Sequence, residues 1–208
     1  MRAAERVFAE QSVDGAQMGD IVRLAGQHNP SAVQYHFGSR TALADAVMAA
    51  RQERVERVLA ALLELVPGVE ARELLAVLVA SEASELGTER GRYCLRISAQ
   101  LSHTSGVRTG IPAPPLRNSA YWTLFERLRG LMGSLPAPVR RERLDLILTM
   151  IGAALADRAR QYLDGDQPLT GEELFLADLV ETSAALLEAP LPGAGALRAL
   201  SELRRSIS

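Results

Sequence analysis

The sequence predicts an all-α protein, and three observations lead to that prediction. Of its 208 residues, 48% are hydrophobic but only 4% are aromatic, and alanine and leucine dominate. Apolar residues recur three and four positions apart, and short glycine or proline breaks separate these periodic stretches. This combination is typical of helices packed on helices. A chain of this length can bury one large core or two smaller ones.

Two short helices are expected first. The first should end near Gln11, since the turn signal at residues 13–15 follows it. The second carries one apolar stripe about two turns long, and Gly26 marks its end. The stripe consists of Met18, Ile21, Val22 and Ala25.

A third helix is expected over residues 29–37. Asn29 can cap free backbone N–H groups, and the proline after it suits the first helical position. Val33 and Phe37 lie four apart and face inward, which leaves the polar residues on the other faces. Gly38 stops this helix, and Ser39 can cap a fourth helix over residues 41–65.

The remainder of the chain shows only a succession of helical patterns bounded by glycine, proline or polar turns. Helices are expected over residues 70–86, 92–102, 116–133, 137–163, 171–187 and 197–205. The expected organisation is a helix-turn-helix domain over residues 1–40, a connecting helix over 41–65, a ligand-binding and dimerisation domain over 66–188, and a linker with a short last helix over 189–208.

Three short helices in about 37 residues form a helix-turn-helix arrangement. Between residues 3 and 43 the sequence contains, in this order, the segments AAERVFAE, VDG, MGDIV, AG and AVQYHFGSR, followed by AL. This order closely resembles the N-terminal domain of TetR-family transcriptional regulators, whose hallmark is an aromatic residue, His and Phe before a short turn and a basic residue. Three positions depart from the family pattern. Gln17 stands at a usual Ser or Thr cap, Gln27 at a frequent glycine, and His28 at a small aliphatic residue.

A helix in the major groove reads base edges with its first turns, while neighbouring polar groups hold phosphates. The residues expected to meet bases are His28, Asn29, Ser31, Ala32 and Gln34. Gln34 can make a bidentate contact to adenine. Tyr35, His36 and Arg40 suit phosphates, as matching positions do in the family, and Thr41 adds a backbone N–H at a helix start. The alternatives are a solvated polar face, and a purely structural role for His36.

Charge supports this interpretation only locally. The net charge is −2, and the first 57 residues hold seven arginines against seven acids. However, residues 24–44 contain no carboxylate, so this surface would not repel phosphate.

The resemblance implies that the C-terminal part binds a small molecule and forms a homodimer through its last two long helices. The residues expected to line the ligand pocket are Leu78, Tyr93, Ile97, Leu101, Trp122, Phe125, Leu128 and Met150. The residues expected at the dimer interface are Leu144, Ile147, Leu148, Ile151, Leu155, Leu174, Leu179 and Leu186. Each set could instead pack a solid core within one chain. No charged residue is evident inside a helix stripe as a ligand anchor, so the sequence leaves the ligand class open.

Other function classes find little support. The three histidines form no HExxH pair, and neither a phosphate loop nor a GxSxG elbow occurs, so we expect neither enzyme activity nor a metal or cofactor. The single Cys94 is interpreted as a small buried hydrophobe in a reducing compartment. With no apolar run long enough to span a membrane, the expected location is cytoplasmic.

The expected function is therefore a ligand-responsive regulator, most simply a repressor, that binds a palindromic DNA operator as a homodimer. The alternative is an all-helical carrier or interaction protein that does not bind DNA.

Overall fold

The protein is described by a computed structural model that covers residues 1–27, 37–66, 69–101 and 107–207. Every regular element in these ranges is helical, and they contain no strand, which confirms the all-α prediction. The α-helices are α1 (Arg2–Gln11), α2 (Met18–Leu24), α4 (Arg40–Leu65), α5 (Ala71–Ala83), α6 (Glu89–Gln100), α7 (Ala120–Leu131), α8 (Ala137–Asp164), α9 (Glu172–Glu188) and α10 (Ala194–Ser206). Two short 3-10 helices are η1 (Ser84–Gly87) and η2 (Pro114–Leu116).

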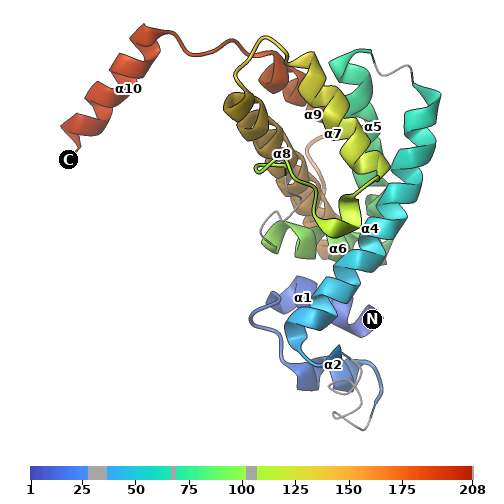
Figure 1. The fold of residues 1–208 in the computed structure, drawn as a ribbon. Coiled ribbons are helices and arrows are strands. Elements are labelled where there is room, and N and C mark those ends of the chain that lie inside the picture. The colour runs from blue at the N-terminus through green and yellow to red at the C-terminus, as the bar shows by residue number, and fades with distance from the viewer. Residues whose placement is uncertain (28–36, 67–68, 102–106, 208) are drawn as a thin grey trace.

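The long helix α4 connects the two ends of the molecule. Figure 1 shows it running from α1 and α2 at one end to the far side of the helical body, beside α5 and α7. The Ser39 cap was predicted correctly, because Ser39 Oγ accepts a hydrogen bond of 3.0 Å from the backbone N–H of Ala42, and the helix begins one residue earlier than expected, at Arg40. One row of side chains four residues apart faces inward along its whole length: Leu43, Val47, Arg51, Val55, Leu59 and Leu63.

Two hydrophobic clusters hold the chain together. The smaller one joins α1, α2 and the start of α4, and it includes Cys94 and Ile97 from α6. The larger one fills the space between α5, α7, α8, α9 and the distal half of α4, with Leu74, Leu124 and Leu155 fully buried. Helix α6 therefore anchors the N-terminal helices to the rest of the protein.

Two helix starts differ from the sequence prediction because of capping residues. Helix α6 begins at Glu89 rather than at residue 92, since Thr88 Oγ1 accepts a 3.0 Å hydrogen bond from the Gly91 N–H. Helix α7 begins at Ala120 rather than at residue 116. Asn118 has a φ of 62°, which an α-helix does not accommodate, and Ser119 then caps the helix through the Trp122 N–H.

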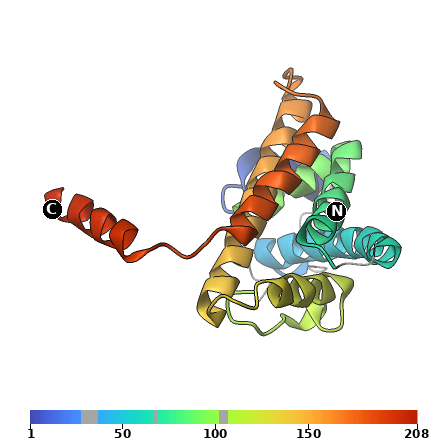
Figure 2. The same cartoon turned by 90° about the horizontal axis from the view of Figure 1, so that it is seen from above.

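Helix α10 stands apart from the body. Figures 1 and 2 show it projecting beyond α8 and α9 at the end of the segment 189–193. None of its residues is buried. Within the described ranges, no helix is long and apolar enough to cross a bilayer.

Candidate functional site

The N-terminal end of α4 carries the two predicted DNA contacts that the structure describes, Arg40 and Thr41. Arg40 is the first residue of the helix, and its Nη1 donates a 3.2 Å hydrogen bond to the Ala16 carbonyl. Its Nη2 lies 3.8 Å from Asp14 Oδ1, but the Asp14 side chain is fully exposed, so this ion pair is weak. The Thr41 side chain is exposed. Arg40 therefore supports the loop before α2 while part of its guanidinium faces solvent.

The other seven predicted DNA contacts lie outside the described residues. They are His28, Asn29, Ser31, Ala32, Gln34, Tyr35 and His36.

The chain turns sharply after α2, at Gly26, where the sequence predicted the end of this helix. Gly26 has a φ of 65°, and the Gln27 N–H donates a 3.1 Å hydrogen bond to the Val22 carbonyl. This bond is typical of a helix end closed by a left-handed glycine. The described residues give Gln17 no side-chain capping bond, so α2 begins without the cap that Ser or Thr would supply.

Helices α1 and α2 and the first two turns of α4 coincide with a known domain. Residues 1–47 match the family model described as bacterial regulatory proteins, tetR family. The N-terminal part of the chain is therefore that of a TetR-type DNA-binding transcriptional regulator. A search among curated proteins found no match to it.

The regulator contains a partly open cavity of about 490 Å³. Helices α4 to α8 and the segment 113–116 surround it. Its apolar wall includes Met48, Leu78, Leu101, Leu148 and Ile151. Its polar and charged lining consists of Asp45, Arg51, Gln52, Glu82, Ser98 and Tyr121. Apolar walls with a few polar groups are typical of sites for small molecules.

The eight residues predicted to line a ligand pocket are spread over several locations. Leu78 and Leu101 line the cavity. Ile97 is fully buried in the smaller hydrophobic cluster, and Tyr93 lines an open groove between α1 and α6. The remaining four belong to the larger cluster or pack against it: Trp122, Phe125, Leu128 and Met150.

Sequence reasoning missed the charged residues of the cavity. Arg51 is only 6% exposed, and it occupies one position of the otherwise apolar row along α4. The expectation that no charged residue lies inside a helix stripe is therefore wrong. The row itself was the available signal, because Arg51 lies four residues from both Val47 and Val55.

Arg51 pairs with Glu82 of α5, and this ion pair forms part of the cavity wall. Burial acts to lower the pKa of Arg51. The charge of Glu82 and its hydrogen bond outweigh this effect, so the pKa is raised and the guanidinium stays charged. The pKa of Tyr121 is raised mainly by burial and further by the negative charge of Glu82, so its phenol stays neutral.

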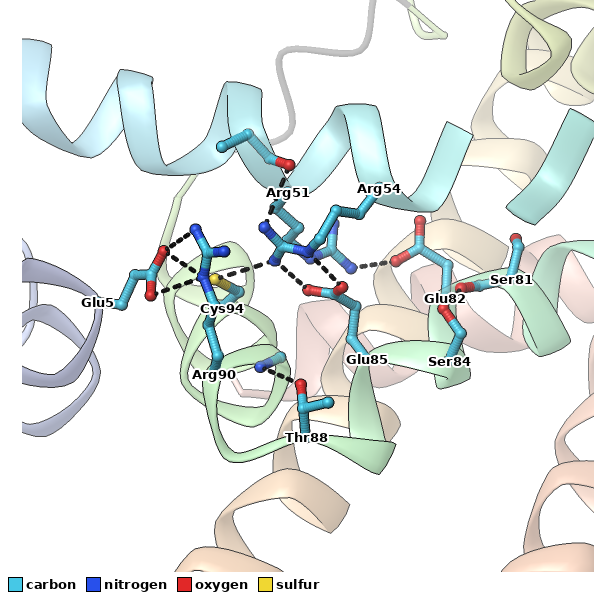
Figure 3. A network of polar contacts seen from close by, with 12 residues as sticks. Glu5, Arg51, Arg54, Ser81, Glu82, Ser84, Glu85, Thr88, Arg90 and Cys94 are labelled. Atoms are coloured by element: carbon cyan, nitrogen blue, oxygen red, sulfur yellow. Dashed lines mark hydrogen bonds and ion pairs between the residues drawn. The ribbon is translucent and has the colours of Figure 1, made fainter. Parts of the chain in front are cut away.

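Two further ion pairs continue from the cavity to the DNA-binding domain, as Figure 3 shows. Arg54 donates to both carboxylate oxygens of Glu85, at 2.9 and 2.6 Å. Arg90 of α6 donates at 2.7 and 2.9 Å to Glu5 of α1, a carboxylate that is almost completely buried. Cys94 lies between these pairs, with its Sγ 3.6 Å from Arg54 Nη2. Polar contacts thus extend from the cavity wall to the first helix.

Cys94 is buried, as the sequence predicted. Burial raises the pKa of its thiol above the usual value, and the nearby Arg54 only partly offsets this effect. The thiol therefore stays protonated. In the described part of the chain, no three or more His, Cys, Asp or Glu side chains gather as they would around a metal ion.

The predicted dimer residues lie mostly inside a single chain. Six of them belong to the larger cluster: Leu144, Ile147, Leu148, Ile151, Leu155 and Leu179. A partner subunit could not reach these side chains, because α6 and α9 already cover this part of α8. Leu174 is 63% exposed, and Leu186 packs partly buried against the cluster. Sequence reasoning did not single out Leu146 of α8, which is 57% exposed.

Proposed function

We propose that this regulator binds a near-palindromic operator as a homodimer and releases it when a small effector occupies the cavity beside α4. The main support for this proposal is that α4 extends from the DNA-binding domain to the cavity. Its first residues belong to the segment that matches the tetR family model, and Arg51 and Gln52 on the same helix line the cavity. A molecule that displaces α4 at the cavity therefore changes the position of the DNA-binding domain, which repression relieved by an effector requires.

The network of ion pairs supports this coupling. The Arg51–Glu82 pair lies at the cavity, whereas the Glu5–Arg90 pair fastens α1 to α6. Because the residues between them share α4, η1 and α6, a shift at one end of the network changes the geometry at the other. The effector and the operator then influence each other's affinity by the same factor.

Arg40→Ala should weaken binding to DNA of every sequence at least tenfold at low salt. The change removes one phosphate contact, so the slope of log affinity against log salt concentration should fall by about one. Both quantities can be measured by fluorescence anisotropy with DNA flanking the gene, compared with unrelated DNA, over a salt series.

The control is Arg57→Ala, which removes the same charge from an exposed position further along α4. We expect it to bind like the parent. If the salt slope of Arg40→Ala equalled that of the parent, Arg40 would make no phosphate contact and would only hold the loop before α2 through the Ala16 carbonyl. If the folded parent bound no DNA at low salt, the alternative of a helical carrier would be favoured.

A homodimer is supported by the apolar surface that one chain leaves exposed. On α10, Leu197, Leu200 and Leu203 lie three residues apart and are all more than half exposed. Charge indicates where this helix docks. Helix α10 carries three arginines and one acid, whereas α9 carries five acids and no base. We therefore place α10 of one subunit against α9 of the other, where it would cover Leu174.

Leu200→Asp should weaken the dimer tenfold or more, because it places a charge in the centre of the apolar face of α10. The side chain makes no buried contact within its own chain, so the subunit should remain folded. Sedimentation equilibrium measures the dissociation constant. Ser201→Asp adds the same charge to the neighbouring residue, about 100° around the helix from Leu200 at the edge of the apolar face, and should weaken the dimer much less. If Leu200→Asp formed a dimer as tight as that of Ser201→Asp, the apolar face of α10 would be excluded as the dimer interface.

A further inference from the structure

Two residues of the cavity wall carry buried hydrogen-bond donors that have no acceptor among the described residues. Arg51 Nε and Gln52 Nε2 are both shielded from solvent, and no acceptor among the described residues lies within hydrogen-bonding distance of either atom. Both residues belong to the cavity wall. An unused buried donor is unfavourable, because it has lost its hydrogen bonds to water without gaining others. A ligand that supplies an acceptor to these nitrogens would offset this loss.

The charges of the wall restrict the form of that acceptor. Glu82 already neutralises Arg51, and Asp45 contributes one further negative charge at an exposed position. A carboxylate that approached Arg51 would meet both acids, and Arg51 is the one cation among the described residues of the wall. A cationic ligand would be attracted by the acids but could accept no hydrogen bond from Arg51 or Gln52. A neutral acceptor satisfies the donors without burying an unpaired charge.

The remaining wall selects an apolar body. Leu78 of α5 and Leu148 and Ile151 of α8 line the wall, and all three also belong to the larger hydrophobic cluster. Among the described residues, the other polar side chains of the lining are the neutral Tyr121 phenol and the Ser98 hydroxyl. The volume of about 490 Å³ accommodates a molecule of drug size.

We propose that the effector is a neutral, largely apolar molecule with a carbonyl oxygen, as in a ketone, ester or amide, and that Arg51 and Gln52 of α4 bind this oxygen. The inference rests on the proposed effector role of the cavity. It adds the chemical class of the effector and the two side chains that recognise it. Because both donors lie on α4, the bound carbonyl pulls directly on the helix that carries the DNA-binding domain.

The test compares three probes of nine carbons that differ in charge: 2-nonanone, nonanoate and nonylamine. Binding to the full chain without DNA is measured by the fluorescence of Trp122, the only tryptophan of the sequence and the neighbour of Tyr121. We expect 2-nonanone to bind at least tenfold more tightly than either charged probe. Tighter binding of nonanoate or nonylamine, or no binding of any probe, would overturn the proposed class.

Gln52→Leu tests the recognition of the carbonyl. It removes one unused donor and adds apolar area, so the variant should fold, and circular dichroism checks this. It should bind 2-nonanone about tenfold more weakly than the parent, as expected for a lost hydrogen bond. Gln167→Leu, at an exposed position remote in sequence from the wall, is the control. Equal affinity of the two variants would exclude Gln52 as a ligand contact.

The proposed function is tested separately by adding 2-nonanone to the complex with DNA. Release of the DNA by 2-nonanone supports both the effector class and the regulatory role. Binding of the ketone with unchanged affinity for DNA would support the class and contradict the regulation. Specific DNA binding by a protein that takes up none of the three probes would contradict the class and leave the regulator in place.

Discussion

Gly91→Ala should lower the free energy of unfolding by about 3 kcal/mol, at the upper end of the range for overpacked sites. Gly91 is buried in the first turn of α6, directly against η1. A methyl group there would clash with the Glu85 carbonyl oxygen, and it would lie 2.7 Å from the Glu85 carbonyl carbon and Cα. These are backbone atoms, so no side-chain rotation relieves the clash. Urea unfolding followed by circular dichroism measures the loss.

The control for this prediction is Gly130→Ala. Gly130 also lies in a helix, α7, and among the described residues no atom comes within 4 Å of the position that its added methyl group would occupy. This substitution should raise the stability by up to about 1 kcal/mol, because alanine favours the helix. Equal unfolding midpoints for the two variants would show that η1 moves away from α6 at little cost.

Gly91→Ala should also affect function, because Glu85 is the partner of Arg54. A displacement of η1 moves this carboxylate relative to α4. The affinity for DNA of the folded fraction should therefore change, whereas Gly130→Ala should leave it unaltered.

The helices could be predicted from the sequence wherever a local signal determines them. The Ser39 cap and the glycine turn at Gly26 are of this kind, because both act within a few residues. The start of α7 was placed too early, because Leu116 fits a helical pattern by its apolar character. The left-handed conformation of Asn118 is the deciding feature, and hydrophobic periodicity carries no information about it.

The cavity and its ion pairs could be predicted only in part. Apolar spacing identified Leu78 and Leu101 as cavity residues. The partners of the buried charged residues lie far along the chain: Glu82 is 31 residues from Arg51, and Arg90 is 85 residues from Glu5. A helical pattern shows that Arg51 faces inward, but only the packing of α4 on α5 shows which acid compensates it.

The surplus of leucine and isoleucine on α8 has a similar explanation. A helix covered on one side needs one apolar stripe, and α8 has more than one. In the structure α8 is packed between α6 and α9 and also touches α7. The sequence pattern is therefore that of a helix buried on several sides, which is indistinguishable from a subunit interface until the neighbours are placed.

Arg54→Met should lower the free energy of unfolding by about 3 kcal/mol, because it leaves a buried carboxylate without its cation. The Glu85 side chain is only 6% exposed, and Arg54 supplies two hydrogen bonds to it. These bonds raise the pKa of Arg54 above its usual value, so the guanidinium is charged at every pH at which the protein folds. Arg57→Met, at an exposed position of the same helix, should change the stability by less than about 0.5 kcal/mol.

The double variant Arg54→Met with Glu85→Met separates the charge from the packing. If the uncompensated carboxylate causes the loss, removing it should restore at least half of the stability, since two apolar side chains can occupy the same space. If the double variant were as unstable as Arg54→Met, the lost packing of the arginine stem would instead explain the loss of stability. In the first case, the double variant also tests the coupling between the cavity and the DNA-binding domain. It would be a stable protein without the central ion pair, and its affinity for DNA should then respond less to 2-nonanone than that of the parent.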